Sequence, residues 1–219
     1  MAVKAPRRVK SQNTRKKIFD AAARLLKKHG EDYLTIANIC DEAGISKGTF
    51  FYHFNSKEDL MLYYLQEGFD NFVAEHNGDA VERAGDDVYL LVLYLYQEYL
   101  DYCQSMGIEF VSNYYQSKNK ALDARSVMGT PDTMNFLLKA CAEGLLAAQK
   151  AGFVREDWSA NDISYDCCSV IKGCVFEWCI TDGAIDLNAH AEHMLHAYFT
   201  NVVTDRYRET FPFTEPPMA

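Results

Sequence analysis

The sequence predicts an all-α protein of about nine helices, divided into a small N-terminal domain and a larger helical C-terminal domain. Apolar residues recur at helical spacing along most of the chain, and no stretch alternates as a β-strand does. Capping residues stand at most of the expected helix starts, and glycine stands at several ends. Charge divides the chain similarly: residues 1–60 hold 12 Lys and Arg against 7 Asp and Glu (net +5), and residues 61–219 hold 10 against 24 (net −14).

The N-terminal domain is expected over residues 13–55, behind a polar and basic segment of residues 1–12 that has no periodicity. That segment is either an arm whose basic side chains touch phosphates or a solvated tail. The first helix is predicted over residues 13–29, because apolar side chains recur there at helical spacing and Gly30 follows.

Two short helices joined by a tight turn are expected between Thr35 and Phe54. Thr35 caps the first helix, Gly44 stands where the chain must reverse, and Ser46 caps the second helix. This is the helix-turn-helix arrangement, whose second helix enters the major groove of DNA and reads bases with its N-terminal residues. A basic domain beside an acidic one fits phosphate binding at one end of the molecule.

The C-terminal domain is expected over residues 56–210, followed by a Pro-rich tail, 211–219. Capping residues and apolar spacing predict six helices there, at about 56–77, 86–105, 108–117, 130–151, 159–181 and 186–208. The first of these helices would begin in the N-terminal domain and end in the larger one. It is therefore either a mechanical lever between the two domains or a plain connection.

The string from Thr35 to Leu60, which ends in Y-H-F-N-S-K-E-D-L, resembles the tetracycline-repressor (TetR) family of bacterial transcriptional regulators. The resemblance covers roughly residues 13–62. It implies an all-α fold of nine helices and a homodimer that binds a palindromic operator. It also implies that a small ligand binds the larger domain and releases the DNA.

Nine residues are expected to contact DNA, by this resemblance or by their place at a helix N-terminus: Thr35, Ser46, Lys47, Gly48, Thr49, Phe51, Tyr52, His53 and Lys57. Residues 47–49 occupy the base-reading turn, and Thr35 and Lys57 match phosphate-contacting positions. A helix N-terminus favours anions, and a lysine there can reach guanine O6 or N7. Phe51 departs from the family, which commonly has tyrosine there, so this position lacks the hydroxyl that could donate a hydrogen bond to phosphate.

A pocket is expected in the C-terminal domain, where seven of the fourteen tyrosines lie between Tyr89 and Tyr115. Tyrosine joins a flat apolar face to a hydroxyl that needs a partner, so a cluster can line a pocket for a planar, partly polar ligand. The alternative is ordinary core packing. The residues expected to line the pocket are Tyr94, Tyr99, Phe110, Tyr114, Phe136 and Trp178. The ligand-binding habit of the family favours the pocket, whose effector stays unidentified.

The last two predicted helices carry apolar residues on two sides, which suggests packing on the core and on a twofold partner. The dimer interface is expected at Ile163, Cys167, Val170, Ile171, Cys174, Met194, Leu195, Tyr198 and Val202. Two recognition helices about one DNA turn apart, ~34–36 Å, would address a palindrome.

Two other functions stay open. The histidines His190, His193 and His196 and the adjacent Cys167 and Cys168 would suit a metal- or redox-sensing regulator, or an enzyme. The second alternative is a DNA-binding regulator without a small-molecule ligand. No nucleophile–base set and no phosphate-binding glycine loop appears in the sequence, so we expect no catalysis, no cofactor and no resident metal.

The composition favours a cytoplasmic protein. The seven cysteines show no C-x-x-C pair and no regular spacing, which favours reduced thiols. No apolar run follows the charged N-terminal residues, and no stretch reaches the length of a membrane helix. The expected partners are therefore double-stranded operator DNA, a second copy of the chain and a small-molecule effector, with no membrane.

Overall fold

The computed structural model of the protein describes residues 7–57, 59–61, 69, 79–115 and 134–213. Within these ranges every named element is a helix, and the only strand-like feature is an isolated antiparallel bridge between Val154 and Val203. The all-α prediction is therefore confirmed.

The chain divides into two compact units, which we call the N-terminal unit (Met1–Gly68) and the C-terminal unit (Phe69–Ala219). The N-terminal unit holds 12 Lys and Arg against 8 Asp and Glu (net +4), and the C-terminal unit holds 10 against 23 (net −13). The division at Gly68 lies within the helix expected over residues 56–77, beyond the boundary expected at residue 55.

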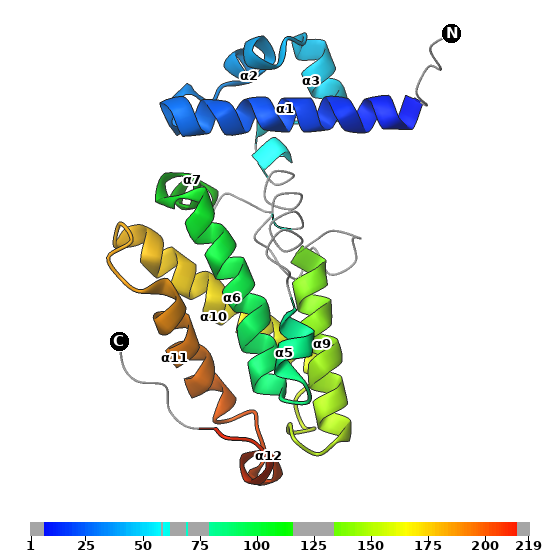
Figure 1. The fold of residues 1–219 in the computed structure, drawn as a ribbon, viewed down its shortest axis with the longest axis vertical. Helices are drawn as coiled ribbons and strands as arrows, with labels where there is room; N and C mark the ends of the chain where they lie inside the picture. Colours follow the sequence, from blue (N-terminus) through cyan, green and yellow to red (C-terminus); the bar gives the residue numbers. More distant parts are fainter. Residues whose placement is uncertain (1–6, 58, 62–68, 70–78, 116–133, 214–219) are drawn as a thin grey trace. The chain divides into compact units, whose positions relative to one another are not determined.

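Four helical elements build the described part of the N-terminal unit: α1 (Arg7–His29), the 3-10 helix η1 (Glu31–Tyr33), α2 (Ile36–Ala43) and α3 (Lys47–His53). α2 and α3 contact each other and both contact α1, against whose side they lie in Figure 1. α1 begins at Arg7 rather than at residue 13, so the second half of the expected arm is helical.

The core of the N-terminal unit forms where these helices meet. Its fully buried side chains come from α1, α2, α3 and the segments after η1 and α3: Ile18, Ala21, Ala22, Leu34, Ile39, Ala43, Phe50, Phe54 and Leu60. Leu25 and Cys40 are nearly as deeply buried. The apolar spacing that predicted the first helix is thus the spacing of the buried face of α1.

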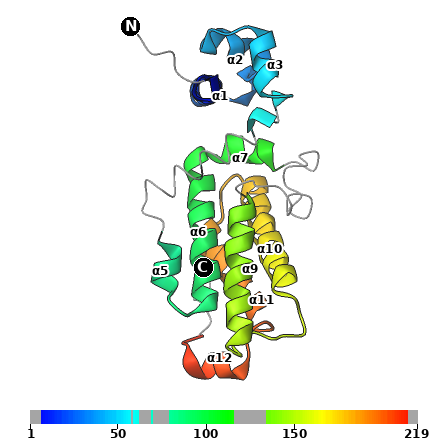
Figure 2. The same ribbon diagram turned by 90° about the vertical axis from the view of Figure 1, so that its right-hand side faces the viewer.

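The C-terminal unit contains seven described α-helices: α5 (Ala80–Ala84), α6 (Val88–Met106), α7 (Ile108–Tyr114), α9 (Met134–Lys150), α10 (Ala160–Ile180), α11 (Leu187–Phe199) and α12 (Asp205–Thr210). α6 packs on α9 and α11, and α10 packs on the same two helices. Figure 2 shows α7 lying across one end of this bundle and α12 across the other. The helices bury much of their apolar surface against one another, as a helix bundle requires.

The helix expected over residues 186–208 is two helices. α11 ends at Phe199, and α12 begins at Asp205. Between them the chain pairs with the segment after α9, because the N–H of Thr204 donates to the carbonyl of Phe153 (3.0 Å) and the N–H of Arg155 donates to the carbonyl of Val202 (3.0 Å). With this break and the short helix α5, the described residues hold ten α-helices where about nine were expected for the chain.

The start of the helix expected at residues 56–77 is described, but most of it lies outside the described residues. Residues 57, 59–61 and 69 are helical. The Ser56 hydroxyl accepts from the N–H of Asp59 (3.1 Å), and the Asp59 carboxylate accepts from the N–H of Asn55 (2.9 Å). This reciprocal pair resembles a capping box.

No helix within the described ranges combines the length and the apolar character needed to cross a membrane.

Candidate nucleic-acid interface

The turn between α2 and α3 depends on Gly44, whose φ of +59° and ψ of +47° are left-handed. The N–H of Ile45 donates to the carbonyl of Cys40 (3.0 Å), and the N–H of Gly44 donates to the carbonyl of Asp41 (3.1 Å). These are the two bonds of a Schellman motif, which ends a helix at a left-handed residue. Any side chain at residue 44 would be strained by this φ.

Side-chain caps begin both helices of the motif. The Thr35 hydroxyl accepts from the N–H of Asn38 (3.2 Å) at the start of α2. The Ser46 hydroxyl accepts from the N–H of Thr49 (3.1 Å) at the start of α3. The hydroxyls of Ser46 and Thr49 also lie 2.9 Å apart as a hydrogen bond, which orients both side chains. The helix-turn-helix expected between Thr35 and Phe54 is therefore present.

α3 buries one side and presents the other to solvent. Phe50 is fully buried, whereas Phe51 and Tyr52 are 51% and 72% exposed. Lys47 and Gly48 are exposed in the first turn of the same helix. Two exposed aromatic rings beside an exposed lysine form a surface that offers stacking faces, a hydroxyl and a positive charge.

His53 ends α3 and is half-buried. Its ring meets the Tyr52 ring edge-on, with the centroids 5.0 Å apart. Burial lowers the pKa of His53, and the positive charge of Arg15 lowers it further. His53 is therefore a neutral hydrogen-bonding group near pH 7, rather than a counter-charge for phosphate.

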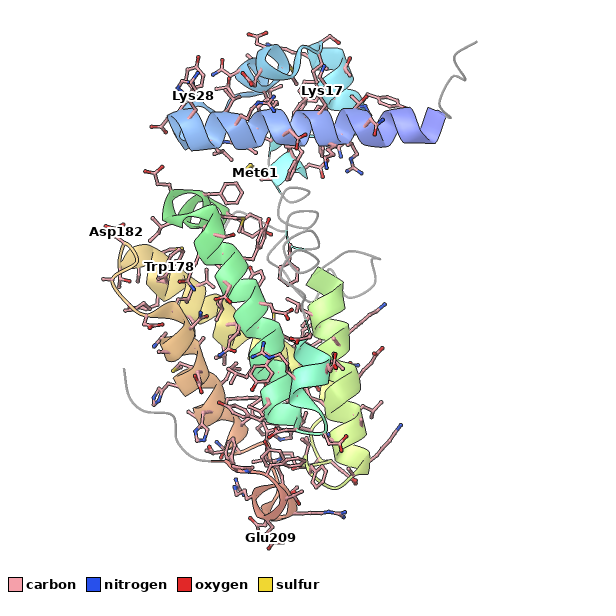
Figure 3. All side chains as sticks on the ribbon, viewed as in Figure 1. Lys17, Lys28, Met61, Trp178, Asp182 and Glu209 are labelled. Atoms are coloured by element: carbon pink, nitrogen blue, oxygen red, sulfur yellow. The ribbon has the colours of Figure 1, made fainter. Side chains whose placement is uncertain are left out.

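The nine residues expected to contact DNA lie on this motif or next to it in the sequence. Thr35, Ser46, Lys47, Gly48, Phe51 and Tyr52 are exposed, and Thr49, His53 and Lys57 are half-buried. Exposed Lys17 and Lys28 add positive charge along α1 (Figure 3). The DNA contacts of the nine side chains stay a prediction.

The contact of Arg15 with the end of α3 was not expected from the sequence. This side chain of α1 lies over the ring of Phe54, with its guanidinium carbon 5.0 Å from the ring centroid. The spacing could have indicated it, because Arg15 stands three residues before buried Ile18 and therefore near the same face of the helix.

Four of the six residues expected to line a ligand pocket are buried in the C-terminal unit: Tyr99, Phe110, Tyr114 and Trp178. The hydroxyls of Tyr99 and Tyr115 form a hydrogen bond of 2.5 Å, and the Tyr114 ring packs edge-on against the Tyr115 ring. Trp178 lies near the end of α10, close to the turn that carries Asp182 (Figure 3). A pocket at this aromatic cluster stays a prediction.

The other two residues of the expected pocket are Tyr94 and Phe136. Tyr94 is half-buried, and the guanidinium of Arg83 from α5 stacks over its ring at 4.1 Å. Phe136 belongs to α9, but its side chain lies outside the described residues.

Six of the nine side chains expected at the dimer interface are buried within the chain itself: Ile163, Cys167, Ile171, Cys174, Leu195 and Val202. The interface stays a prediction. Val170 and Tyr198 are half-buried, and Met194 is exposed. Phe176 and Ile180, which were not expected at this interface, are exposed apolar side chains of α10.

The three histidines of α11 do not converge. His196 is buried and stacks on Phe213, with the ring centroids 4.2 Å apart. His190 is half-buried, and His193 is exposed. Across the part of the chain that the structure describes, no three His, Cys, Asp or Glu residues are placed to hold a metal ion.

All seven cysteines are buried free thiols. Burial raises the pKa of Cys103 and of Cys141 to about 12, and it also raises the pKa of Cys167 and of Cys168. A reactive thiol needs an exposed, electropositive setting that favours the thiolate. The Cys167–Cys168 pair has the opposite setting, which argues against redox sensing there.

A surface groove of about 460 Å³ lies between α9 and the start of α10. Its lining includes Leu146, Gln149 and Trp158. None of the residues expected to bind a ligand lines this groove.

Residues 18–64 match the family model described as bacterial regulatory proteins, tetR family. The matched segment lies within the N-terminal unit and contains all of α2 and α3. It also contains the nine residues expected to contact DNA.

A curated relative supports this match. The HTH-type transcriptional regulator TtgR of Pseudomonas putida is 35% identical to this chain over 79 residues, which are 34% of this chain and 38% of that protein. The chain thus spans little more than a third of the length of the first curated relatives that it matches.

Solved structures resemble the chain over most of its length. RolR in complex with resorcinol matches with a TM-score of 0.64 and 17% identity, over 97% of this chain and all of that one. FadR of Thermus thermophilus in complex with lauroyl-CoA matches with a TM-score of 0.56 and 20% identity, over 85% of this chain and 94% of that one. At these identities the likeness concerns the fold, which extends through the C-terminal unit.

Proposed function

Since this chain carries the DNA-binding domain of the TetR family of bacterial regulators, we propose that it is a transcriptional repressor. In this proposal a homodimer binds a palindromic operator in the cytoplasm. A small molecule that binds the C-terminal unit then releases the DNA. The release is a population shift, because the ligand favours a conformation in which the two recognition helices no longer match the operator.

The surface of α3 is the observation that carries the proposal. Tyr52 and Phe51 are among the most exposed large apolar side chains of the described residues, and they follow buried Phe50 on a helix of seven residues. Exposed aromatic rings next to Lys47 suit contacts to sugar, phosphate and base edges. The net charge of +4 on this unit supplies the sequence-independent attraction to DNA.

Binding to DNA from upstream of the chain's own gene tests this proposal by fluorescence anisotropy. Lys47→Ala and Tyr52→Ala should each weaken binding by about 5- to 100-fold, since a good base or backbone contact is worth about 1–3 kcal/mol. Lys139→Ala is the matched control, because Lys139 is an exposed lysine of α9 in the acidic unit. Binding that stays unchanged in both α3 variants would contradict the assignment of α3 as the recognition helix.

The dimer surface that we propose is the exposed side of α10 together with α11. Ser169, Gly173, Phe176 and Ile180 follow each other at helical spacing on α10, and all four are exposed. A Cβ at Gly173 would meet no atom of the described residues within 4 Å, so none of these residues covers the helix there.

Exposed Met194 lies on α11, which packs against α10. A partner helix can therefore approach closely over the small residues and bury the large apolar ones, as in a four-helix interface.

The effector site that we propose is the aromatic cluster around Tyr99, Tyr114 and Tyr115. Buried hydroxyls that now satisfy each other can exchange partners with a polar group of a ligand. The liganded neighbours support a ligand in this fold, since RolR was solved with resorcinol and Thermus FadR with lauroyl-CoA.

Titration of the protein–operator complex with resorcinol and with lauroyl-CoA tests two chemical classes of effector. Release by one of them that is lost in Tyr99→Phe would support the site. A ligand that releases DNA equally from Tyr99→Phe and Tyr114→Phe would argue against it.

A further inference from the structure

Arg15 of α1 contacts the residue that follows the recognition helix α3. Its guanidinium carbon lies 5.0 Å from the centroid of the Phe54 ring, which is fully buried and follows the last residue of α3. The N–H of Phe54 donates to the carbonyl of Phe50 (2.9 Å), so the backbone of Phe54 is bonded to the last turn of α3. A cation over an aromatic face is attracted by the ring quadrupole, and the attraction grows as both groups leave water.

Packed rings connect this contact with the exposed face of α3. The Phe54 and Phe50 rings lie 5.8 Å apart, and the Phe50 ring meets the Phe51 ring edge-on at 5.5 Å. Phe51 is half exposed and belongs to the expected DNA surface. Neighbouring side chains therefore connect Arg15 with that surface.

The charge of Arg15 also acts on His53, where it adds to burial in lowering the pKa of the imidazole. Charged groups of the neighbouring elements are engaged elsewhere: Glu42 of α2 pairs with Arg24 (2.8 Å), and Asp59 accepts from Asn55. Lys57, on the helical segment after Ser56, is half-buried and carries the same charge as Arg15. Arg15 is thus the residue of α1 whose charge acts on His53.

We propose that Arg15 is a positioning residue for DNA recognition. It holds the end of α3 on α1 through Phe54, and its charge adds to burial in disfavouring the charged form of His53 where the recognition helix faces DNA. The protein then binds its operator with the same protonation state of His53 across the physiological pH range. This inference rests on the proposed DNA binding, but its first test needs no DNA.

The first test is an NMR titration of the His53 imidazole in the full chain, without DNA. Arg15→Met removes the charge, so the pKa of His53 should rise but stay below its ordinary value, because burial remains. Arg15→Lys keeps the charge and should leave the titration close to that of the wild type. Arg24→Met is the matched control, since Arg24 is another arginine of α1 whose guanidinium pairs with Glu42.

The second test measures affinity for the upstream DNA at pH 6 and at pH 8. For each protein, the affinity at pH 6 is divided by the affinity at pH 8. This ratio should be about three- to tenfold larger for Arg15→Met than for the wild type, because protonated His53 adds a positive charge near phosphates. At pH 8 both Arg15 variants should bind about three- to tenfold more weakly than the wild type, because the stacked guanidinium is lost. The double variant Arg15→Met/His53→Gln should lose the added pH dependence.

Several outcomes would overturn the inference. One is a His53 titration that does not change in Arg15→Met, and another is a pH profile that Arg24→Met alters as much as Arg15→Met does. If the wild type binds no upstream DNA, the proposed function fails, but the titration still decides whether Arg15 controls His53. If Arg15→Met does not fold, Arg15→Gln takes its place, since it also removes the charge.

Discussion

At residue 44 the backbone passes through the left-handed region, and glycine alone does so without strain. Gly48, four residues further on, is different: it lies in the first turn of α3 with helical geometry, and a Cβ there would meet only the Ser46 hydroxyl at 3.7 Å. The same residue type therefore serves a turn at one position and an exposed helix surface at the other.

Gly44→Ala and Gly48→Ala should have opposite effects on folding. Gly44→Ala should lower the free energy of unfolding by about 1–2 kcal/mol, since a left-handed conformation strains alanine. Gly48→Ala should raise it by up to about 1 kcal/mol through helix propensity, while it weakens DNA binding by placing a methyl group on the base-reading surface. Urea denaturation and anisotropy measure the two effects. Equal effects on stability would contradict the assigned turn.

The buried thiols should make the protein less stable in alkali. Burial raises the pKa of Cys103 and Cys141 to about 12, from about 9 in the unfolded chain. Above pH 9 the unfolded state therefore binds fewer protons than the folded state, and stability falls as pH rises. The expected loss is about 1.4 kcal/mol per pH unit for each thiol between about pH 9 and pH 12. Denaturation at pH 8 and at pH 10 measures it, and Cys103→Ala should reduce the slope.

At the scale of the element, helical spacing predicted which residues share a face but could not choose between two apolar faces of one helix. On α10 the stripe through Ile163, Cys167, Ile171 and Cys174 turned inward, and the stripe through Phe176 and Ile180 stayed exposed. Both stripes have the spacing of an amphipathic helix, and contacts from distant parts of the chain decide which is buried.

Charge substitution on the exposed stripe of α10 should separate the two copies of the chain. Ile180 and Phe176 are 59% and 51% exposed, so Ile180→Glu and Phe176→Glu should cost little in folding but should place a charge in an apolar interface. Val81→Glu on α5 is the matched control, because Val81 is 63% exposed and lies on another helix. Sedimentation should show monomers for the α10 variants and dimers for the control. Dimers in all three would contradict this surface.

Element ends were predictable where a local signal exists. Thr35, Ser46, Ser159 and Asp186 cap helices as their residue types suggested. The break after Phe199 was not predictable in this way, because it depends on pairing with Phe153 and Arg155, more than forty residues earlier in the chain. The contact of Arg15 with Phe54 is equally nonlocal, so the sequence motif contained the DNA surface but not its support from α1.

At the scale of the whole molecule, the total charge of −9 conceals a basic N-terminal unit and an acidic C-terminal unit. Local charge counts could reveal this division from the sequence, since they need no knowledge of the fold.

A count of tyrosines, by contrast, could not predict where each side chain lies in the fold. The density of tyrosines pointed to the region of Tyr99 and Tyr114, but α6 turns Tyr94 toward Arg83 of α5 instead.

The most direct test of DNA reading by α3 is a footprint of the full chain on DNA from upstream of its own gene, repeated over a range of salt concentrations. One protected palindrome with two copies of the chain bound is expected. The logarithm of the binding constant should fall by about 0.9 per neutralised phosphate for each tenfold rise in salt concentration. Lys47→Ala and Tyr52→Ala should erase the protection. Protection of no discrete site, or protection that persists in both variants, would contradict the claim that the exposed face of α3 reads DNA.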